Sequence, residues 1–297
     1  MFMRKVKIIT DSCADLNGEQ LKRYDIDYVR MSTVEEGKEA PALLTWSAEE
    51  AHELYEAIRK GRRITTAQVA MEEFFSVFER YLKEGFDIVY IACSSRQSGS
   101  VSTGHVAAQR LLRKYPEAMI YCIDSLNASI GEGMLAMDAA KLAAEGTDAD
   151  SINSHITGIR NNVREFATAH TLEYLKRAGR VSASSAFMGN LMGVKPIITV
   201  DAGGAQVACG KVKGRRNALR EIVLRLRESM TDTKNQTVYV AHADCRKEEV
   251  DEVVRLVEEE IDCGDVSVGY IGPIVGASTG PDTIGVWAYG RTVDFRG

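Results

Sequence analysis

The sequence predicts an α/β protein of two domains, an N-terminal parallel α/β/α sheet of the Rossmann-like kind and a C-terminal mixed α+β sheet with helices. The chain has 297 residues, more than one hydrophobic core usually holds. Over its first half, short apolar runs alternate with helical patterns, which is typical of a parallel sheet covered on both faces. Beyond about residue 160 a hairpin and long helices replace this alternation, so we place the domains at residues 1–160 and 161–297.

The first domain is expected to begin with a strand that ends in a polar turn. Residues 6–10 are mostly apolar, and Asp11-Ser12 follows them. Ser47 and Glu50 form a capping-box pattern, which predicts a helix from there to Arg59. The other elements expected in this domain are helices at 71–83, 101–114 and 131–144 and strands at 87–93 and 118–123. In a parallel sheet ligands bind at the carboxyl ends of the strands, so the turns that follow the strands are candidate sites.

The second domain is expected to contain a hairpin followed by long helices. Gly179 ends a short helix at 171–177, since glycine readily takes the left-handed conformation that closes a helix. Strands at 195–200 and 205–213 flank a Gly-containing turn, which predicts the hairpin. The remaining elements expected are helices at 216–230 and 247–261 and strands at 237–241 and 266–271.

The composition is that of an ordinary globular protein, and it argues against two classes of partner. A net charge of −5 and a pI of about 5.7 disfavour general nucleic-acid binding, which needs a net basic face. No run of apolar residues approaches the ~18 that a membrane-spanning helix requires. We therefore expect a cytoplasmic protein with no stable membrane insertion.

The cysteines and histidines give no signal of a disulfide framework or a metal site. The six cysteines are scattered without a C-x-x-C pair. The five histidines show no ligand spacing with the cysteines or with one another. Cys93 and Cys122 fall in apolar runs and are interpreted as small core residues. No disulfide, metal or cofactor is expected.

The most informative stretch is the hydroxyl-rich turn at residues 94–100, with the sequence SSRQSGS. It lies between the strand at 87–93 and the helix that begins at 101. Such a turn directs backbone N–H groups and hydroxyl donors to one point beside a helix N-terminus, which carries partial positive charge. It is therefore a candidate anion site. Arg96 could supply a counter-charge there, although an arginine in a turn is more often solvated.

Several short segments, in the same order along nearly the whole chain, resemble motifs of the DegV family of bacterial lipid-binding proteins. The segments are Ile9-Thr10-Asp11-Ser12, Thr66-Ala67-Gln68, residues 94–100, Asp124-Ser125 with Ser129 and Gly131-Glu132-Gly133, residues 171–180, Lys195-Pro196-Ile197 and residues 271–281.

This resemblance implies a protein that binds a long-chain fatty acid and is not itself an enzyme. It implies that the hydroxyl groups of Thr66 and Ser98 hold the carboxylate in the first domain, and that the second domain covers the acyl chain. It also implies a partner, a fatty acid kinase that phosphorylates the bound carboxylate. The ligand-binding candidates are Thr66, Ser98, Gly99, Ser278, Thr279 and Arg96.

The chain departs from the family pattern at several positions. Ser278 stands where the family commonly has a histidine that can contribute to the carboxylate site. Gln97 replaces an apolar residue, and Lys213-Gly214 replace an Arg-Thr pair. These departures affect the geometry of the head-group site and the identity of the partner more than the fold.

Simpler structural roles compete with ligand binding at these residues. Thr66 could be the N-cap of the helix at 71–83, and Ser98 or Ser100 could cap the helix at 101–114. Asp11 and Asp124 are most simply turn formers. The apolar residues at 187–192 could belong to the core or line the pocket for an acyl tail.

Two other classes of function have weaker support. Residues 276–280 match G-x-S-x-G, but a serine hydrolase of that type needs a histidine later in the chain, and His242 is the last one. Gly131 and Gly133 are two of the three glycines of a dinucleotide motif, with Ala136 at the third position. A sensor of a small phosphate or carboxylate ligand, without an acyl tunnel, remains the alternative.

A basic set in the second domain suggests where a protein partner could dock. Its residues are Arg177, Arg180, Lys213 and Arg215, with Lys211 and Arg216 close in sequence. A docking patch of this kind would raise the association rate with an acidic partner more than the affinity. The alternative is an ordinary solvated surface.

Overall fold

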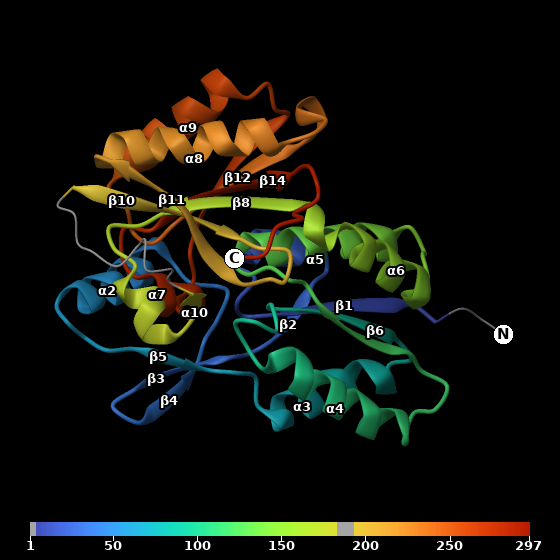
Figure 1. The fold of residues 1–297 in the computed structure, drawn as a ribbon. Coiled ribbons are helices and arrows are strands. Elements are labelled where there is room, and N and C mark those ends of the chain that lie inside the picture. Colours follow the sequence, from blue (N-terminus) through green and yellow to red (C-terminus); the bar gives the residue numbers. More distant parts are fainter. Residues whose placement is uncertain (1–3, 183–192) are drawn as a thin grey trace. The chain divides into compact units, whose positions relative to one another are not determined.

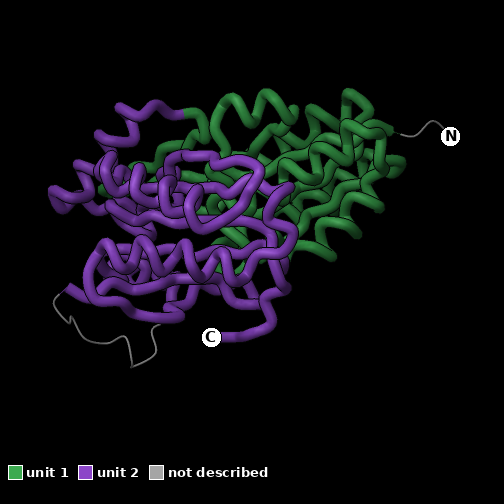
Figure 2. The backbone as a smooth tube through the Cα atoms, turned by 90° about the horizontal axis from the view of Figure 1, so that it is seen from above, with its two compact units in different colours: residues 1–45, 66–160 green, residues 46–65, 161–297 purple. Residues whose placement is uncertain are grey.

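The computed structural model describes residues 4–182 and 193–297 (Figure 1). The chain forms two compact units (Figure 2): unit 1 comprises residues 1–45 and 66–160, and unit 2 comprises residues 46–65 and 161–297. The sequence assigned residues 46–65 to the first domain, whereas in the structure they belong to unit 2. The reason is that Tyr55 in this segment is fully buried and donates its hydroxyl to Ile271 O at 2.6 Å.

Unit 1 is built on a parallel sheet with the strand order β2-β1-β6-β7. Its strands are β1 (Val6–Asp11), β2 (Asp27–Val29), β6 (Asp87–Ala92) and β7 (Ile120–Asp124). Its helices are α1 (Gly18–Arg23), α3 (Met71–Lys83), α4 (Ser100–Leu112), α5 (Ile130–Ala144) and α6 (Ala149–Ile159). Helices α3 and α4 lie on one face of the sheet and α5 and α6 on the other (Figure 1), which confirms the predicted α/β/α arrangement.

The central strand of this sheet explains why it is buried on both faces. Every residue of β6 is buried, and the strand pairs in parallel with β1 and β7, as Ile9 opposite Tyr90 illustrates. On one face Tyr90 packs edge-to-face against Phe74 and Phe78 of α3 at centroid distances of 5.3 and 6.0 Å. The phenylalanines at four-residue spacing in α3 therefore form the core that their periodicity predicted.

A small three-stranded sheet with the order β4-β3-β5 accompanies this unit. Its strands are β3 (Ser32–Glu35), β4 (Lys38–Pro41) and β5 (Thr65–Ala67). The sequence does not predict these strands, because they are short and most of their residues are polar. Thr66 lies in the middle of β5.

Unit 2 contains a mixed seven-stranded sheet with the order β13-β12-β14-β8-β10-β11-β9. Its strands are β8 (Val163–Thr168), β9 (Val181–Ser182), β10 (Val194–Val200), β11 (Gln206–Lys213), β12 (Thr237–His242), β13 (Asp265–Tyr270) and β14 (Ile284–Tyr289). Strands β10 and β11 pair antiparallel as the predicted hairpin. The unpredicted strands β8 and β14 join this hairpin to the parallel pair β12 and β13, so the sheet is mixed as expected.

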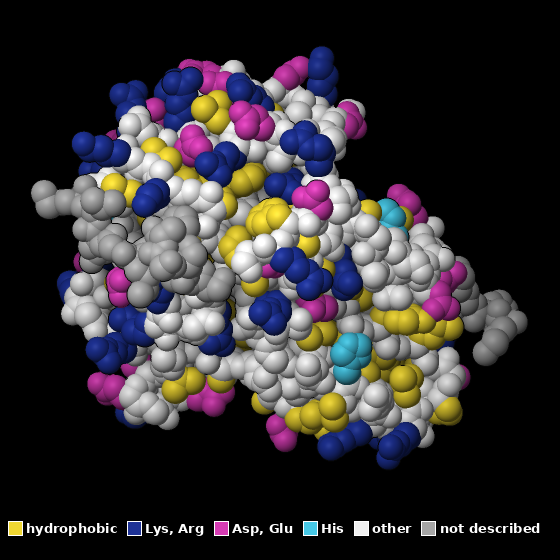
Figure 3. Space-filling model, in the orientation of Figure 1, with side chains coloured by type: hydrophobic (Ala, Val, Ile, Leu, Met, Phe, Trp, Pro, Cys, Tyr) yellow, Lys and Arg dark blue, Asp and Glu magenta, His cyan; other side chains and the backbone are white. Residues whose placement is uncertain are grey.

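The helices of unit 2 include long, charged helices over one face of this sheet and shorter helices packed on one another. The helices are α2 (Ala48–Arg59), α7 (Glu173–Ala178), α8 (Arg215–Ser229), α9 (Lys247–Glu260) and α10 (Pro273–Thr279), with 3-10 turns at Arg160–Asn162 and Thr233–Asn235. Helices α8 and α9 cover the sheet (Figure 1), and positive and negative side chains are interspersed over their outer surface (Figure 3). Helix α10 packs against α2 and α7.

Within the described ranges, no helix is both long enough and apolar enough to cross a membrane.

Candidate functional site

The hydroxyl-rich turn begins directly after β6, at the carboxyl end of the parallel sheet. Contrary to the sequence expectation, most of its backbone N–H groups are not free. Those of Gln97 and Ser98 both donate to Ser94 O at 2.9 Å, and that of Ser95 donates to Asp124 Oδ1 at 3.1 Å. The Ser94 carbonyl and the Asp124 carboxylate thus satisfy these donors, as in an ordinary polar turn. The donors that face a possible anion are the Ser98 hydroxyl and the first-turn N–H groups of Val101 and Ser102 in α4, since the N–H of Ser100 already donates to Ser98 Oγ.

Ser98 and Ser100 form a hydroxyl pair at the start of α4. Their Oγ atoms lie 2.9 Å apart, and Ser98 Oγ also accepts the N–H of Ser100 at 3.2 Å. Ser98 is half-buried, whereas Ser100 is fully buried. Neither serine is the N-cap that the alternative interpretation proposed, because the N-cap is Gly99 and it has no side-chain capping bond. Within this pair the half-buried Ser98 hydroxyl is thus held in place by the buried Ser100 hydroxyl.

The segment that carries Thr66 is bonded to this turn. Val69 donates its N–H to Ser100 Oγ at 3.2 Å, and Gln68 donates Nε2–H to Thr103 Oγ1 at 2.9 Å. Thr66 itself is half-buried in β5, so it is not the N-cap of α3, which is Ala70. The structure therefore joins the residue 66–69 segment to the 98–103 segment within unit 1. Ser100 and Gln68 make this connection, and sequence reasoning missed their role because more than thirty residues separate the bonded pairs.

Gly99 lies where these two segments meet. A Cβ atom at this position would overlap Gln68 Oε1 and lie 3.1 Å from Gln68 Cδ. The glycine therefore leaves room for the Gln68 side chain against the turn. Arg96, in contrast, is exposed and belongs to the solvated class of turn arginines.

Ser278 and Thr279 lie in unit 2, in the last turn of helix α10. Both are half-buried, and Thr279 donates its hydroxyl to Val275 O at 3.1 Å, within the helix. The flanking glycines have packing roles, because a Cβ atom on Gly276 would overlap the Tyr55 hydroxyl and one on Gly280 would overlap the Tyr174 ring. The G-x-S-x-G match thus lies inside a short helix, and it lacks the strand-to-helix turn that exposes a hydrolase nucleophile.

The predicted basic set is only partly available for docking. Arg215 is 13% exposed, forms an ion pair with Glu249 at 3.2 Å and donates to Asp282 O at 2.7 Å. Burial makes this pair part of the interior of unit 2, so Arg215 is removed from the set. Lys213 and Arg177 are exposed, and the Arg177 guanidinium lies 4.8 Å from the centroid of the Tyr174 ring. Arg180 donates to Ala178 O. Residues 187–192, a candidate lining for an acyl tail, lie outside the described residues.

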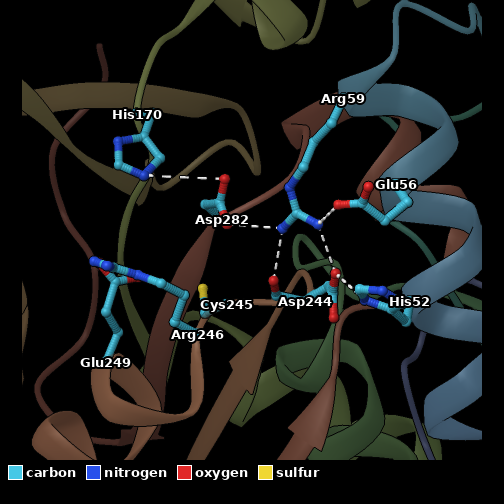
Figure 4. Close-up of a pocket in the computed structure, with 9 residues that line it drawn as sticks. All are labelled: His52, Glu56, Arg59, His170, Asp244, Cys245, Arg246, Glu249 and Asp282. Atoms are coloured by element: carbon cyan, nitrogen blue, oxygen red, sulfur yellow. Dashed lines mark hydrogen bonds and ion pairs between the residues drawn. The ribbon is translucent and has the colours of Figure 1, made fainter.

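Unit 2 also has a pocket of about 610 Å³ that sequence reasoning did not identify (Figure 4). Charged side chains from α2, the loops after β12 and β8, α9 and the loop before β14 line it. The lining residues are His52, Glu56, Arg59, His170, Asp244, Cys245, Arg246, Glu249 and Asp282. A lining with this many ionised groups suits a polar ligand and is unsuited to an acyl chain.

The charges in this pocket are largely paired with one another. Arg59 lies among three carboxylates, at 2.6 Å from Asp244, 2.8 Å from Asp282 and 3.0 Å from Glu56. Burial lowers the pKa of Arg59, but hydrogen bonds to Asp282 and Asp244 outweigh it and raise the pKa overall.

His52 and His170 lie at opposite sides of this network in Figure 4. His52 Nδ1 lies 3.0 Å from Asp244. His170 Nδ1 accepts a hydrogen bond from Lys195 Nζ at 2.8 Å, so the ring hydrogen is on Nε2. Nε2 lies 4.0 Å from Asp282 Oδ2. Burial, with the nearby Arg215 and Lys195, lowers the pKa of His170 and favours the neutral ring. The pocket is thus an internal network of ion pairs.

Comparison with known proteins places the whole chain in a well-defined group. The sequence model of the family described as "Uncharacterised protein, DegV family" matches residues 5–291. A DegV domain-containing protein of Clostridium perfringens is 33% identical over 294 residues, which are 98% of this chain and 99% of that protein.

Two solved structures share the fold and carry informative titles. One, titled "Fatty Acid Binding of a DegV family Protein from Thermus thermophilus", has a TM-score of 0.86 and 25% identity, and covers 97% of this chain and 100% of that one. The other is a stearic acid-binding protein of Eubacterium ventriosum, with a TM-score of 0.84, 26% identity and coverage of 96% and 98%.

Proposed function

The chain belongs to the DegV family, and from this membership we propose that it binds one long-chain fatty acid and presents the carboxylate to a partner fatty acid kinase. The observation that carries the proposal is the match over residues 5–291, together with the fatty acids named for the relatives from Thermus and Eubacterium. In this proposal the protein is a carrier, and the kinase supplies the phosphoryl-transfer chemistry.

The carboxylate is assigned to the hydroxyls of Ser98 and Thr66, with Gly99 leaving the turn open. Support comes from the bonded connection between the 66–69 and 98–103 segments and from the half-buried position of both hydroxyls. The first-turn N–H groups of α4 add donors of the right polarity for an anion. Ser278 and Thr279 remain candidate ligand-binding residues of unit 2, and the exposed Arg96 is assigned a minor contribution that solvent screens.

In this proposal the acyl chain supplies most of the binding free energy, and the two hydroxyls fix the position of the carboxylate. Burying about fifteen methylene groups at ~0.8 kcal/mol each gives a ceiling near ~12 kcal/mol before the cost of association is subtracted. A hydrogen bond to a charged carboxylate contributes about 1.5–3 kcal/mol. Loss of both hydroxyls should therefore weaken retention and broaden head-group selectivity while leaving much of the tail's contribution in place.

Mass spectrometry of an organic extract of the purified protein, compared with a denatured blank, tests the proposal directly. One equivalent of a long-chain fatty acid is expected, and its chain length is read from the mass. An empty extract, combined with no uptake of added oleate or palmitate, would overturn fatty-acid binding. In that case, binding of inorganic phosphate or acetate that is lost in Ser98→Ala would favour the small-anion sensor.

Two variants locate the head-group site. Thr66→Ala with Ser98→Ala should lower fatty-acid retention at unchanged helical content. Ser95→Ala, an exposed serine of the same turn, is the matched control and should retain the ligand. Equal retention in the double variant and in the control would remove Thr66 and Ser98 from the site.

The docking patch is assigned to Arg177, Lys213 and Arg180, with Arg215 left out because it is buried in an ion pair. In a reaction with a fatty acid kinase and ATP, Arg177→Glu with Lys213→Glu should slow acyl-phosphate formation and leave the bound lipid unchanged. Lys234→Glu with Lys247→Glu, at two lysines that are 77% and 81% exposed and lie outside the patch, carries the same change of charge as a control. Equal slowing of acyl-phosphate formation in the patch variant and the control would show that net charge, and not a docking patch, causes the effect.

A further inference from the structure

Three buried side chains of ligand type meet at the carboxyl edge of the parallel sheet in unit 1. Cys13, Cys93 and Glu132 each place one candidate ligand atom within 4.8 Å of the other two. Their exposed fractions are 2%, 2% and 0%. Cys13 and Cys93 follow the adjacent parallel strands β1 and β6, and Glu132 lies in the first turn of α5, which packs on β1.

The carboxylate of Glu132 is incompletely satisfied by the protein. Thr10 Oγ1 lies 2.8 Å from Glu132 Oε1 and 3.1 Å from Ile91 O, so its one hydrogen faces two acceptors. In the part of the chain that the structure describes, the buried Oε2 has no hydrogen-bond partner at all. A buried acceptor left in this state is costly. Burial and the neighbouring Asp11 raise the pKa of Glu132.

Asp11 holds both cysteines in place. Its Oδ1 accepts the N–H of Cys13 at 2.9 Å, and its Oδ2 accepts the N–H of Cys93 at 3.1 Å and the Tyr90 hydroxyl at 2.7 Å. One carboxylate thus fixes the backbone of two cysteines from different strands. Partners of this kind, bonded to the residues that bear the ligands, orient metal sites in general.

We propose that Cys13, Cys93 and Glu132 form a binding site for one thiophilic divalent ion of the Zn²⁺ type. Two thiolates and a carboxylate are a ligand set that zinc accepts, at about 2.3 Å to sulfur and 2.0–2.2 Å to oxygen. Ligand atoms on one tetrahedral zinc lie roughly 3.5–3.8 Å apart by these lengths, so distances of up to 4.8 Å would shorten by about 1.3 Å at most on binding. Binding forms two metal–sulfur bonds and one metal–oxygen bond, and each of the two cysteine thiols releases one proton to solvent.

A bound cation would account for two features of the cluster, the unpartnered Glu132 oxygen and the two neighbouring buried acidic side chains. The cation bonds the oxygen that lacks a partner, and its charge offsets the buried carboxylates of Glu132 and Asp11. It also ties the ends of β1 and β6 to α5, so the bound form of unit 1 is the more stable one. The proposal does not depend on fatty-acid binding, because the cluster is buried beneath the strand ends and none of its members is assigned to the head-group site.

The test uses the full-length protein, reduced with a phosphine and treated with EDTA, and titrated with Co²⁺ as a spectroscopic substitute for Zn²⁺. One equivalent should produce thiolate-to-cobalt charge-transfer absorption, and Zn²⁺ should abolish it by displacement. Cys93→Ser should weaken the band and lower the Co²⁺ affinity at least about tenfold, and Glu132→Gln should lower the affinity with the band retained. Cys122→Ser, a buried cysteine on β7 of the same sheet, is the matched control and should behave as the wild type.

The wild-type protein alone can overturn the proposal, even if the variants fold poorly. Zn²⁺ should raise its thermal midpoint, and EDTA should reverse the change. The absence of a charge-transfer band and of a shift in the midpoint would show that the three groups are a neutral buried cluster. A loss in Cys122→Ser equal to that in Cys93→Ser, with both variants folded by circular dichroism, would place the ion elsewhere.

Discussion

Gly99 and Gln68 lie so close together that no side chain can be added at position 99 without moving the glutamine. The nearest approach is to the end of a flexible side chain, so Gly99→Ala can be accommodated if Gln68 rotates away. Rotation breaks the bond of Gln68 to Thr103, which has an N···O distance of 2.9 Å.

We expect Gly99→Ala to fold, with a free energy of unfolding lower by about 1 kcal/mol from the lost hydrogen bond. Fatty-acid retention should fall as well, because Gln68 is two residues from Thr66. Gly158→Ala in α6 has no neighbour within 4 Å of the new Cβ and is the control, expected to be neutral or slightly stabilising. Urea unfolding and lipid extraction measure the two effects. Full retention in Gly99→Ala would show that the Gln68 position is irrelevant to the ligand.

Ser100 is expected to matter for stability more than any other hydroxyl of the turn. Val69 is fully buried, and its N–H donates to Ser100 Oγ, so Ser100→Ala leaves a buried donor without its acceptor. The free energy of unfolding should fall by about 1–3 kcal/mol. Ser95→Ala, at an exposed position, should change it by less than about 0.5 kcal/mol. Similar unfolding curves for both variants would contradict the assigned role of Ser100.

Arg215 and Arg216 are neighbours in sequence with opposite expected effects. Arg215 pairs with Glu249 at side-chain exposures of 13% and 9%, whereas Arg216 is 83% exposed. Arg215→Ala leaves the buried Glu249 carboxylate with the exposed Arg246 as its ion-pair partner, so it should cost about 1–3 kcal/mol of stability. Arg216→Ala should cost less than about 0.5 kcal/mol. Chemical denaturation of the two variants measures the difference in stability. Equal unfolding midpoints would show that Arg215 is not a buried structural residue and belongs with the exposed basic set.

Glu165 should make unit 2 less stable as the pH rises from about 4.5 to about 7. Burial raises its pKa to about 7, although hydrogen bonds from Gln206 and Trp287 act in the opposite direction. The unfolded chain ionises this group near its ordinary value of 4.5. The folded state therefore holds an extra proton between about pH 4.5 and 7, and the contribution of Glu165 to stability is full below that window and lost above it.

The size of this effect is about 3 kcal/mol between pH 5 and 8. It is measured as the difference in unfolding free energy between the wild type and Glu165→Gln across that range. Trp287 Nε1 donates to Glu165 at 3.2 Å. In a Trp46→Phe background the fluorescence of Trp287 should therefore titrate with a midpoint at the folded-state pKa of Glu165, about 7. A difference that does not change with pH would mean that Glu165 is ionised in the folded protein.

The residues that define local structure could be read from the sequence. The Ser47–Glu50 capping box is present with both of its bonds, helix α3 has the predicted limits, and Gly179 closes α7 with φ of 67°. The hairpin of β10 and β11 was also predicted. Short elements rich in polar residues, such as β3 and β5, escaped prediction because their burial comes from distant partners rather than from a periodic apolar face.

The order of most helices and strands could be predicted from the sequence alone, because capping, glycine conformation and apolar periodicity depend on neighbours along the chain. The family and the candidate hydroxyls came from the resemblance of short motifs to those of the DegV family. The tertiary structure alone decided which donors stay free and which charges are buried. In the folded chain Ser100 accepts a hydrogen bond from Val69, and Arg215 is buried in an ion pair with Glu249. Cys13, Cys93 and Glu132, which are far apart in sequence, lie together. These outcomes depend on packing between segments far apart in sequence, where spacing along the chain carries no information about distance.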